Sequence, residues 1–338
     1  MIKIIVDTLG GDRSPYANIE GALLALENIK DVHLILVGRE DDINKELEGK
    51  SYDKSRLEVL NAPDEITCHD VPTEAIRKKK ESSLYKAIEL LRTDESCGGL
   101  VSTGSTGAIL AGAVLRLGRI KGVKRPAFCP ILPTMKRGVV GLCDSGANVD
   151  CDSLQLSQFA LMGSLYMELA QGISSPRVGL LNIGVEDEKG DLLRKETRAL
   201  LAEDKRINFV GNMEAREFLS GDYDLVVADG FSGNVLLKST EGACLEMLKL
   251  FKGVFYKNLK TKLAAAILKK DVYEVKGFMD YNNYGGAVLL GANKTVVKGH
   301  GSSKGYSVYK CIEQAYNMEK SGLREAIAKA FQPKPVEE

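Results

Sequence analysis

The stretch Ile2-Lys3-Ile4-Ile5-Val6-Asp7-Thr8-Leu9-Gly10-Gly11-Asp12 joins a short apolar, β-branched run to a small polar loop. The same combination recurs along the chain, with helical patterns between the runs. A strand that is apolar almost throughout is buried on both faces, which is typical of parallel sheets. The other runs that we predict as strands are Val32–Val37, Leu57–Leu60, Gly99–Ser102, Val139–Cys143, Val178–Asn182, Ile207–Val210, Leu225–Ala228 and Thr295–Lys298.

Strands that alternate with helices many times over predict βαβ units with right-handed crossovers. We therefore expect a doubly wound α/β fold with a mostly parallel sheet and helices on both faces. The chain shows no repeat of roughly 20 to 50 residues and no internal linker rich in proline and serine. This pattern predicts a single α/β domain over residues 1–331, with a helical insert near 245–275 and a disordered tail over 332–338.

The composition indicates a globular protein and disfavours several classes. The chain has 338 residues with 44% hydrophobic content, and its 46 basic residues equal its 46 acidic ones, so no net positive field favours nucleic-acid binding. Seven scattered cysteines without CxxC spacing favour reduced thiols over a zinc site. The N-terminal apolar run is too short for a signal peptide, and no run reaches the roughly 18 residues of a membrane span, so we expect a cytoplasmic protein.

The loop Ser102-Thr103-Gly104-Ser105-Thr106-Gly107 follows a predicted strand. Ligands of open α/β sheets bind beyond the carboxyl ends of the strands. Glycines let backbone N–H groups converge on an anion, and the hydroxyls of Ser102, Ser105 and Thr106 could complete a phosphate cradle. A tight turn with a helix N-cap explains the same residues equally well. The loop lacks Walker A and GxGxxG spacing, which disfavours a nucleotide.

The segment Asp144-Ser145-Gly146-Ala147-Asn148-Val149-Asp150-Cys151-Asp152 is acidic. Its carboxylates could bind a divalent ion or orient a basic group, but capping of turns is the favoured interpretation for most of them. The aspartates on both sides of Cys151 should raise the pKa of its thiol. We therefore discount a covalent cysteine mechanism.

Two basic residues follow predicted strands. Lys189, after Val178–Asn182, could hold a phosphate or polarise a thioester carbonyl, although a solvated lysine is the commoner case. His300 lies in Gly299-His300-Gly301-Ser302-Ser303-Lys304, where imidazole, hydroxyls and glycine amides could meet an anion at a helix start, with simple N-capping as the alternative. The remaining histidines, His33 and His69, are predicted to be structural.

The segment Leu248–Lys270 is basic and amphipathic. Its apolar residues Phe251, Phe255, Leu259, Leu263 and Ile267 recur at i,i+4 spacing among lysines at 252, 257, 260, 262, 269 and 270. Such a segment can lie on an anionic lipid surface or receive an acidic partner; an ordinary surface helix packed on the core is the alternative. Because Gly253 interrupts the pattern, a hairpin of two short helices fits better than one straight helix.

Seven pieces of sequence, in order, resemble the bacterial phosphate acyltransferase family of fatty acid and phospholipid synthesis proteins, from about Ile4 to Lys320. They are Val6–Asp12, Ser102–Ala108, Arg125–Ala127, Asp144–Asp150, Leu181–Gly190, Asp229–Lys238, and Tyr284–Ala287 leading to His300–Ser303. This chain differs from the family pattern at Leu9, at Asp12-Arg13 and at Ser105, where asparagine is usual.

The resemblance implies a fold similar to phosphotransacetylases and isocitrate-dehydrogenase-like proteins. It also implies a homodimer, no required metal, nucleotide or other cofactor, and transfer of a fatty acyl group from acyl carrier protein to inorganic phosphate. The acyl phosphate would pass to a membrane glycerol-3-phosphate acyltransferase, on the way to phosphatidic acid. Association with the inner face of an anionic membrane would involve Phe251, Phe255, Leu259, Leu263, Lys257 and Lys260.

We expect direct attack of phosphate on the acyl thioester in a ternary complex, with catalysis by positioning and charge neutralisation. Lys189 and His300 are candidates for electrostatic or acid/base roles, and Asn148 and Asp150 for orientation. The candidate phosphate ligands are Ser102, Gly104, Ser105, Thr106, Gly107 and Ser302. The alternatives are a phosphotransacetylase that uses coenzyme A thioesters, a dehydrogenase of related architecture, and a noncatalytic membrane scaffold.

Overall fold

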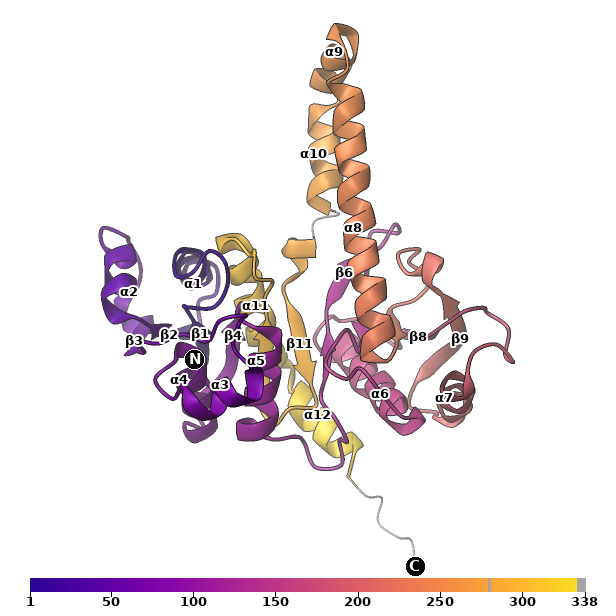
Figure 1. Ribbon diagram of the computed structural model, residues 1–338, viewed down its shortest axis with the longest axis horizontal. Coiled ribbons are helices and arrows are strands. Elements are labelled where there is room, and N and C mark those ends of the chain that lie inside the picture. Colours follow the sequence, from indigo (N-terminus) through magenta and orange to yellow (C-terminus); the bar gives the residue numbers. More distant parts are fainter. Residues whose placement is uncertain (279–280, 333–338) are drawn as a thin grey trace, which may run out of the picture.

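The computed structural model describes residues 1–278 and 281–332, whose strands form two sheets beside each other (Figure 1). The first sheet has the order β3-β2-β1-β4-β12-β11-β5, and β11 alone runs antiparallel to the other strands. Their bounds are β1 Ile2–Asp7, β2 Val32–Gly38, β3 Leu57–Asn61, β4 Cys97–Ser102, β5 Ala127–Cys129, β11 Ala287–Leu290 and β12 Thr295–Lys298.

The second sheet has the order β6-β7-β10-β8-β9, and only the β6–β7 pair is antiparallel. Its bounds are β6 Ile131–Pro133, β7 Val139–Cys143, β8 Arg177–Asn182, β9 Asn208–Glu214 and β10 Leu225–Val227. All nine predicted strands are present, and the predicted α/β class with mostly parallel strands is confirmed.

Residues 127–133 connect the two sheets, where we had expected a single one. β5 pairs with β11 of the first sheet and β6 with β7 of the second. Between them lies Pro130, which has no N–H to donate to a ladder. Its carbonyl still accepts from the Leu142 N–H at 3.1 Å, so the second sheet begins where the first ends.

Helices cover both faces of the first sheet (Figure 1). Buried residues of α1 and α11 share one core cluster with Ile4, Val6 and Val101, whereas those of α3, α4 and α5 share another with Ile5 and Leu100. α6 and α7 cover one face of the second sheet. The helix bounds are α1 Tyr16–Asn28, α2 Glu40–Leu47, α3 Pro72–Lys78, α4 Ser83–Thr93, α5 Thr106–Gly112, α6 Ser153–Leu169, α7 Leu192–Glu203, α11 Gly305–Ser321 and α12 Leu323–Ala330. Short turns of other helix types are η1 Lys54–Arg56, η2 Ala113–Leu117, η3 Ala215–Glu217 and η4 Tyr281–Tyr284.

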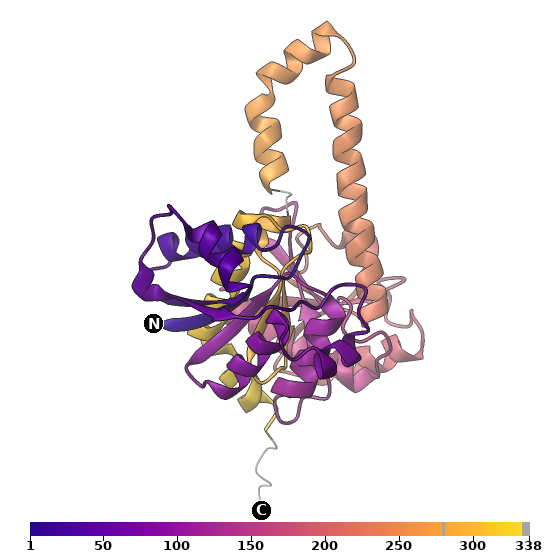
Figure 2. The same ribbon diagram turned by 60° about the vertical axis from the view of Figure 1, so that its left-hand side comes forward.

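An arm of three helices projects from the body (Figures 1 and 2). α8 (Gly230–Phe255) starts in the core and runs outward, α9 (Leu259–Ile267) forms the tip, and α10 (Lys269–Phe278) returns. The apolar i,i+4 series is therefore divided between two helices: the chain turns after Phe255, and Asn258 caps α9 through a reciprocal pair of hydrogen bonds with Thr261.

The helical insert predicted near 245–275 begins earlier, because α8 is continuous from Gly230 and Gly253 lies inside it. No helix in the two described stretches is both long enough and apolar enough to cross a bilayer. The predicted tail lies outside the described residues from position 333 onward.

Candidate active site

Three loops meet at the carboxyl edge of the first sheet. β1, β4 and β12 are neighbours and run in the same direction, and their last residues share one register row: Asp7 pairs with Ser102, and Ser102 pairs with Lys298. The loops that continue from this row are 8–12, 103–107 and 299–304. The row brings together the first, second and last of the motifs that carried the family resemblance.

Asp7 organises the base of this site. It is buried, and its carboxylate accepts hydrogen bonds from Ser83 Oγ at 2.6 Å, Ser102 Oγ at 2.7 Å and the Leu9 N–H at 3.2 Å. Burial raises the pKa of Asp7, and the hydrogen bonds lower it in part. Ser102, a predicted phosphate ligand, thus uses its hydroxyl to hold the loop, and its Oγ also accepts from the Gly104 N–H at 3.1 Å.

The loops 8–12 and 103–107 are in direct contact. Thr103 Oγ1 donates to the Gly10 carbonyl at 2.5 Å. A Cβ atom at Gly10 would lie 2.6 Å from the Gly104 nitrogen, so only glycine permits this approach. The contact holds the 103–107 loop against the end of β1.

The outer part of the predicted phosphate loop remains accessible. Gly104, Ser105 and Gly107 are half-buried and Thr106 is exposed. Ser105 immediately precedes α5, and its side chain makes no capping bond to that helix. The hydroxyls of Ser105 and Thr106 are therefore better placed to meet a ligand than that of Ser102.

His300 lies directly beside this loop. The Gly299 N–H donates to the Ser102 carbonyl at 2.9 Å, and the Asp12 N–H donates to the Gly301 carbonyl at 2.8 Å. The Ser302 N–H donates to His300 Nδ1 at 3.2 Å, and Ser302 Oγ is 2.8 Å from the same nitrogen. Burial, then the Lys298 and Lys238 ammonium groups, lower the pKa of His300, so the imidazole is neutral at pH 7.

Lys298, Lys238 and Glu241 were missed as site residues in the sequence. Lys298 ends β12, whereas Lys238 and Glu241 lie on α8 with Lys238 Nζ 2.7 Å from Glu241 Oε2. The Lys298 and Lys238 ammonium groups lower the pKa of His300, and the Glu241 carboxylate raises it. The sequence feature that could have identified Lys298 is its position as a lysine at the end of a predicted apolar strand.

Asp144 organises the corresponding edge of the second sheet. It is buried, and its carboxylate accepts from the N–H groups of Phe128 at 3.0 Å and Ala147 at 3.1 Å, and from that of Asn148 at 2.6 Å. The predicted turn-capping role is thus present for this residue. A Cβ atom at Gly233 would lie 1.9 Å from the Asp144 carbonyl oxygen, so this glycine lets α8 start against the loop.

The side chains of Asn148 and Asp150 lie differently. Asn148 is buried, and its Nδ2 donates to the Pro126 carbonyl at 2.8 Å and to Asp144 Oδ2 at 3.0 Å. Asp150 is exposed. Asp152 caps α6 in a reciprocal pair with Gln155 and reaches Lys124 Nζ at 3.2 Å.

Lys189 is exposed in the loop after β8. Its N–H donates to the Glu186 carbonyl at 3.2 Å, and its carbonyl accepts from Asn182 Nδ2 at 3.1 Å. Nearby, Arg194 pairs with Asp229, the N-cap of α8, and donates to Ser232 Oγ at 2.9 Å. Lys189 therefore belongs to the edge of the second sheet.

The thiol of Cys151 is protonated at neutral pH, since burial and then the Asp144 and Asp229 charges raise its pKa to about 11. This agrees with the expected direction, although burial is the larger cause. Within residues 1–278 and 281–332, no group of three or more histidine, cysteine or acidic side chains is arranged to hold a metal ion.

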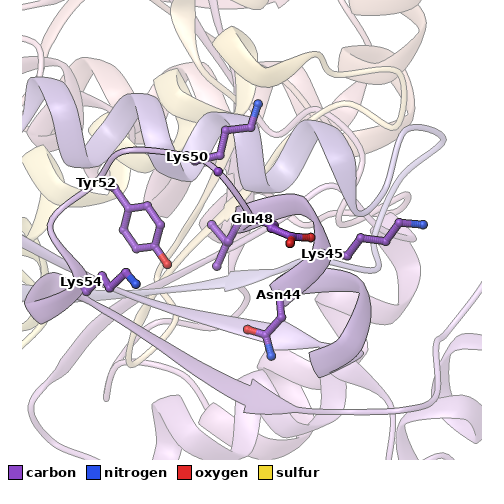
Figure 3. Close-up of a pocket in the computed structure, with 8 residues that line it drawn as sticks. Asn44, Lys45, Glu48, Lys50, Tyr52 and Lys54 are labelled. Carbon is purple, nitrogen blue, oxygen red and sulfur yellow. The ribbon is translucent and has the colours of Figure 1, made fainter.

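A hollow of about 520 Å³ lies elsewhere, at the outer edge of the first sheet (Figure 3). It is lined by α2 and the segment before β3, including Lys45, Lys50, Tyr52 and Lys54. Lys45 and Lys50 direct their ammonium groups apart (Figure 3), so the hollow is not organised around one anion.

Sequence comparison identifies a family for nearly the whole chain. The profile of the family described as "Fatty acid synthesis protein" matches residues 2–326. A phosphate acyltransferase of Clostridioides difficile (strain 630) is 39% identical over 327 residues, which cover 96% of this chain and 95% of that protein. A phosphate acyltransferase of Halothermothrix orenii is 42% identical over 315 residues, which cover 93% and 94%.

Solved structures with the same fold include a phosphotransacetylase from Streptococcus pyogenes, with a TM-score of 0.62, 16% identity and 94% of each chain covered. A branched-chain phosphotransacylase from Enterococcus faecalis V583 has a TM-score of 0.59 at 15% identity and covers 95% of this chain and 100% of its own. These two structural similarities show the fold alone, whereas the sequence matches show the family. The chain therefore belongs to the fatty acid synthesis protein family, among whose members are the phosphate acyltransferases.

Proposed function

We propose that this protein transfers a fatty acyl group from acyl carrier protein to inorganic phosphate and releases acyl phosphate. The observation that carries the proposal is the meeting of the 103–107 and 299–304 loops at one edge of the first sheet, where hydroxyls, amides and the His300 imidazole surround the same surface. The relatives named phosphate acyltransferase support phosphate as the acceptor.

In the proposed reaction a phosphate oxygen forms a bond to the thioester carbonyl carbon, and the carbon–sulfur bond breaks. The thiolate of the carrier's prosthetic group leaves with the bonding electrons. Phosphate is already an anionic nucleophile, so positioning and neutralisation of its charge supply most of the catalysis. Gly104, Ser105, Thr106 and Gly107 would hold phosphate from the loop and Ser302 from the adjoining one, while Ser102 keeps the loop in place.

The hydrogen bond from the Ser302 N–H supports an electrophilic role for His300. Because Nδ1 accepts this bond and the imidazole is neutral, the ring hydrogen lies on Nε2. An Nε2–H can donate to the oxyanion that develops on the thioester carbonyl. A neutral histidine in this tautomer is a donor there and not the base that activates phosphate.

The second sheet would contribute from the opposite loops. Lys189 is exposed and could neutralise charge on the donor or on phosphate. Asn148 is a positioning residue, since its amide already holds Asp144 and the Pro126 carbonyl. Asp150, exposed on the same loop, would orient a basic group.

The arm supports the proposed partners. Its tip residues Leu259, Leu263 and Ile267 are 78%, 61% and 79% exposed, and Phe251, Leu250 and Val254 on α8 are also exposed. A large exposed apolar surface is typical of a binding surface. We assign the tip, with Lys257 and Lys260, to the inner face of an anionic membrane, and the apolar face of α8 to a second copy in a homodimer.

Membrane contact would release acyl phosphate near a membrane glycerol-3-phosphate acyltransferase. Acyl carrier protein, an acidic donor, would be received by the basic surface of the arm. Sedimentation of the wild type and of Leu250→Glu tests the homodimer: a monomeric wild type contradicts it.

The transfer is tested by incubating the purified protein with long-chain acyl carrier protein and phosphate, with acyl coenzyme A in parallel, and following acyl phosphate by mass spectrometry. Phosphate-dependent product from the carrier-protein donor is expected. Product from coenzyme A alone would assign a phosphotransacetylase, and vesicle binding without product from either donor would assign a scaffold.

Single variants test the assigned side chains. We expect His300→Ala and Lys189→Ala to lower turnover by at least roughly tenfold without unfolding the protein, as typical of removing a group that stabilises charge. His69→Ala and Lys195→Ala, exposed residues of the same types, serve as matched controls. Full activity in either test variant removes that residue from the mechanism.

A further inference from the structure

Lys298 is a lysine at the inner end of an interior strand. β12 lies between β4 and β11, and Lys298 is paired with Ser102 on one side and Ala287 on the other. A Cβ atom at Gly286 would lie 2.3 Å from the Lys298 carbonyl oxygen, so the chain is packed tightly around this backbone. Lys298 therefore lies at the same edge of the sheet as the predicted phosphate loop.

The surroundings of Lys298 are poor in compensating charge. Within residues 1–278 and 281–332, the Lys298 Nζ makes no hydrogen bond or ion pair. Lys294, the residue just before β12, instead donates to the Cys97 carbonyl at 3.2 Å. Burial lowers the pKa of Lys298, and the Lys238 ammonium lowers it further, whereas Cys311 and Glu241 act in the opposite direction.

The Glu241 carboxylate raises the pKa of Lys298, but it is already paired with Lys238. Its side chain is 14% exposed and bonds Lys238 Nζ at 2.7 Å, whereas the Lys238 side chain is 53% exposed. Lys298, Lys238 and the neighbouring His300 are thus three basic groups that repel one another when charged. Such a cluster is unfavourable alone and is stabilised by a bound anion.

We propose that Lys298 binds the inorganic phosphate at the carboxyl edge of the first sheet, with Lys238 as an outer cation held in position by Glu241. The assignment rests on the acyl transfer to phosphate proposed above, and it names the residue that would bind the phosphate acceptor. Phosphate carries one to two negative charges near pH 7, whereas a thioester carries none in its ground state. Lys298 is half-buried and is paired with Ser102 on the neighbouring strand. Its ammonium group therefore suits the phosphate acceptor better than the thioester donor.

The decisive variant is Lys298→Met, which keeps the length of the side chain and removes its charge. Calorimetric titration of inorganic phosphate into the full-length protein should show Kd raised roughly 10- to 100-fold, as expected for loss of a charged hydrogen bond. The KM for phosphate should rise in parallel, while the KM for the acyl donor stays within about twofold. Lys294→Met, just before the start of β12, is the matched control and should bind phosphate like the wild type.

A variant that should bind phosphate more tightly than the wild type tests whether the role of Glu241 is purely structural. Glu241→Gln removes the negative charge beside the site, while its amide oxygen can still accept the hydrogen bond from Lys238, so it should lower the Kd for phosphate by about two- to fivefold. If Glu241 were instead the structural counterion of Lys298, its replacement would destabilise the protein and leave phosphate binding unchanged or weaker. Lys298→Arg retains the charge and should bind phosphate better than Lys298→Met, which separates loss of charge from loss of folding.

The outcomes distinguish this assignment from the proposed reaction. A wild type that makes acyl phosphate, with phosphate Kd unchanged in Lys298→Met, overturns the assignment alone. A wild type that makes none from either donor, while Lys298→Met loses phosphate binding, overturns the transfer and supports the site. A wild type that does not bind phosphate overturns the assignment as well.

Discussion

Single side chains hold the two loop systems in place, and Asp7 does so for the first sheet. Its carboxylate is buried beneath the 103–107 loop and accepts the hydroxyl hydrogens of Ser83 and Ser102. Residues 7, 83 and 102 come from three different segments of the chain. A buried acceptor that joins three segments should matter for both stability and the shape of the loop.

Replacing Asp7 by alanine should therefore lower the free energy of unfolding by about 1 to 3 kcal/mol, since Ser83 and Ser102 would each lose a buried acceptor. Urea denaturation followed by circular dichroism measures this change. Glu95→Ala, an exposed acidic residue, is the control and should stay within about 0.5 kcal/mol of the wild type. Equal stability of the two variants would show that Asp7 is not a support of the fold.

At the scale of elements, an ion-pair cluster joins α4 to the segment that follows α5. Glu89 on α4 accepts from Arg116 Nε of η2 at 2.6 Å and from Arg92 Nη2 at 2.9 Å. The Arg116 hydrogen bond is the largest cause that lowers the pKa of Glu89 from 4.5 to about 2. The folded protein therefore favours the ionised carboxylate, and this stabilisation is complete above pH 4.5 and is lost as the pH falls toward 2.

Glu89→Gln should accordingly lower the free energy of unfolding by about 1 to 2 kcal/mol at pH 7, a value reduced for partial exposure to solvent. The difference from the wild type should shrink as the pH is lowered from 4.5 to 2.5. Urea titrations at several pH values measure it, with Glu95→Gln as the control. A difference that does not change with pH would contradict the ion-pair explanation.

The apolar residues at the tip of the arm do not pack against the body of the protein. The tip helix α9 has no buried residue, and its three large apolar side chains are exposed. A substitution there should leave the core unchanged, because none of these side chains packs against it.

The triple variant Leu259→Glu, Leu263→Glu, Ile267→Glu should bind anionic lipid vesicles at least roughly tenfold more weakly, since three apolar contacts are lost and three negative charges added. Vesicle co-sedimentation measures the binding. Val71→Glu, at an exposed apolar residue of the body, should bind like the wild type. Unchanged binding of the triple variant would exclude the tip as the membrane contact.

At the scale of the whole molecule, residues 127–133 couple the two sheets. Phe128 of β5 is 2% exposed and packs in the core of the first sheet. Its N–H donates to Asp144 Oδ1 and its carbonyl accepts from the Ser145 N–H at 3.1 Å, both in the main loop of the second sheet. One residue therefore serves both halves, which supports the proposal that residues 1–331 form a single domain.

Phe128→Ala should lower the free energy of unfolding by about 3 to 5 kcal/mol, as large-to-small changes of buried aromatic residues do. Unfolding followed by circular dichroism and by tyrosine fluorescence should give coincident single transitions for the wild type and the variant. Phe231→Ala is the exposed control. Two separate transitions in the wild type would contradict the single domain.

The sequence alone determined the α/β class, nine of the strands and the loops that follow them, and the family resemblance drawn from seven motifs is confirmed. These features are local: a buried strand shows its apolar run, and a loop at a strand's end shows its glycines and hydroxyls. The same reasoning missed β11 and also β5 and β6, two three-residue strands on either side of Pro130, where a proline interrupts the strand pattern.

Only the tertiary structure decided how the loops are used. Ser102 read as a phosphate ligand in sequence, but its hydroxyl is bonded to Asp7, 95 positions away. Lys298 lay outside the seven motifs and Lys238 stood at the end of one of them, yet the charges of both lysines act on His300 in the folded protein. Proximity between residues distant in the chain depends on sheet order and register, and a single sequence records neither.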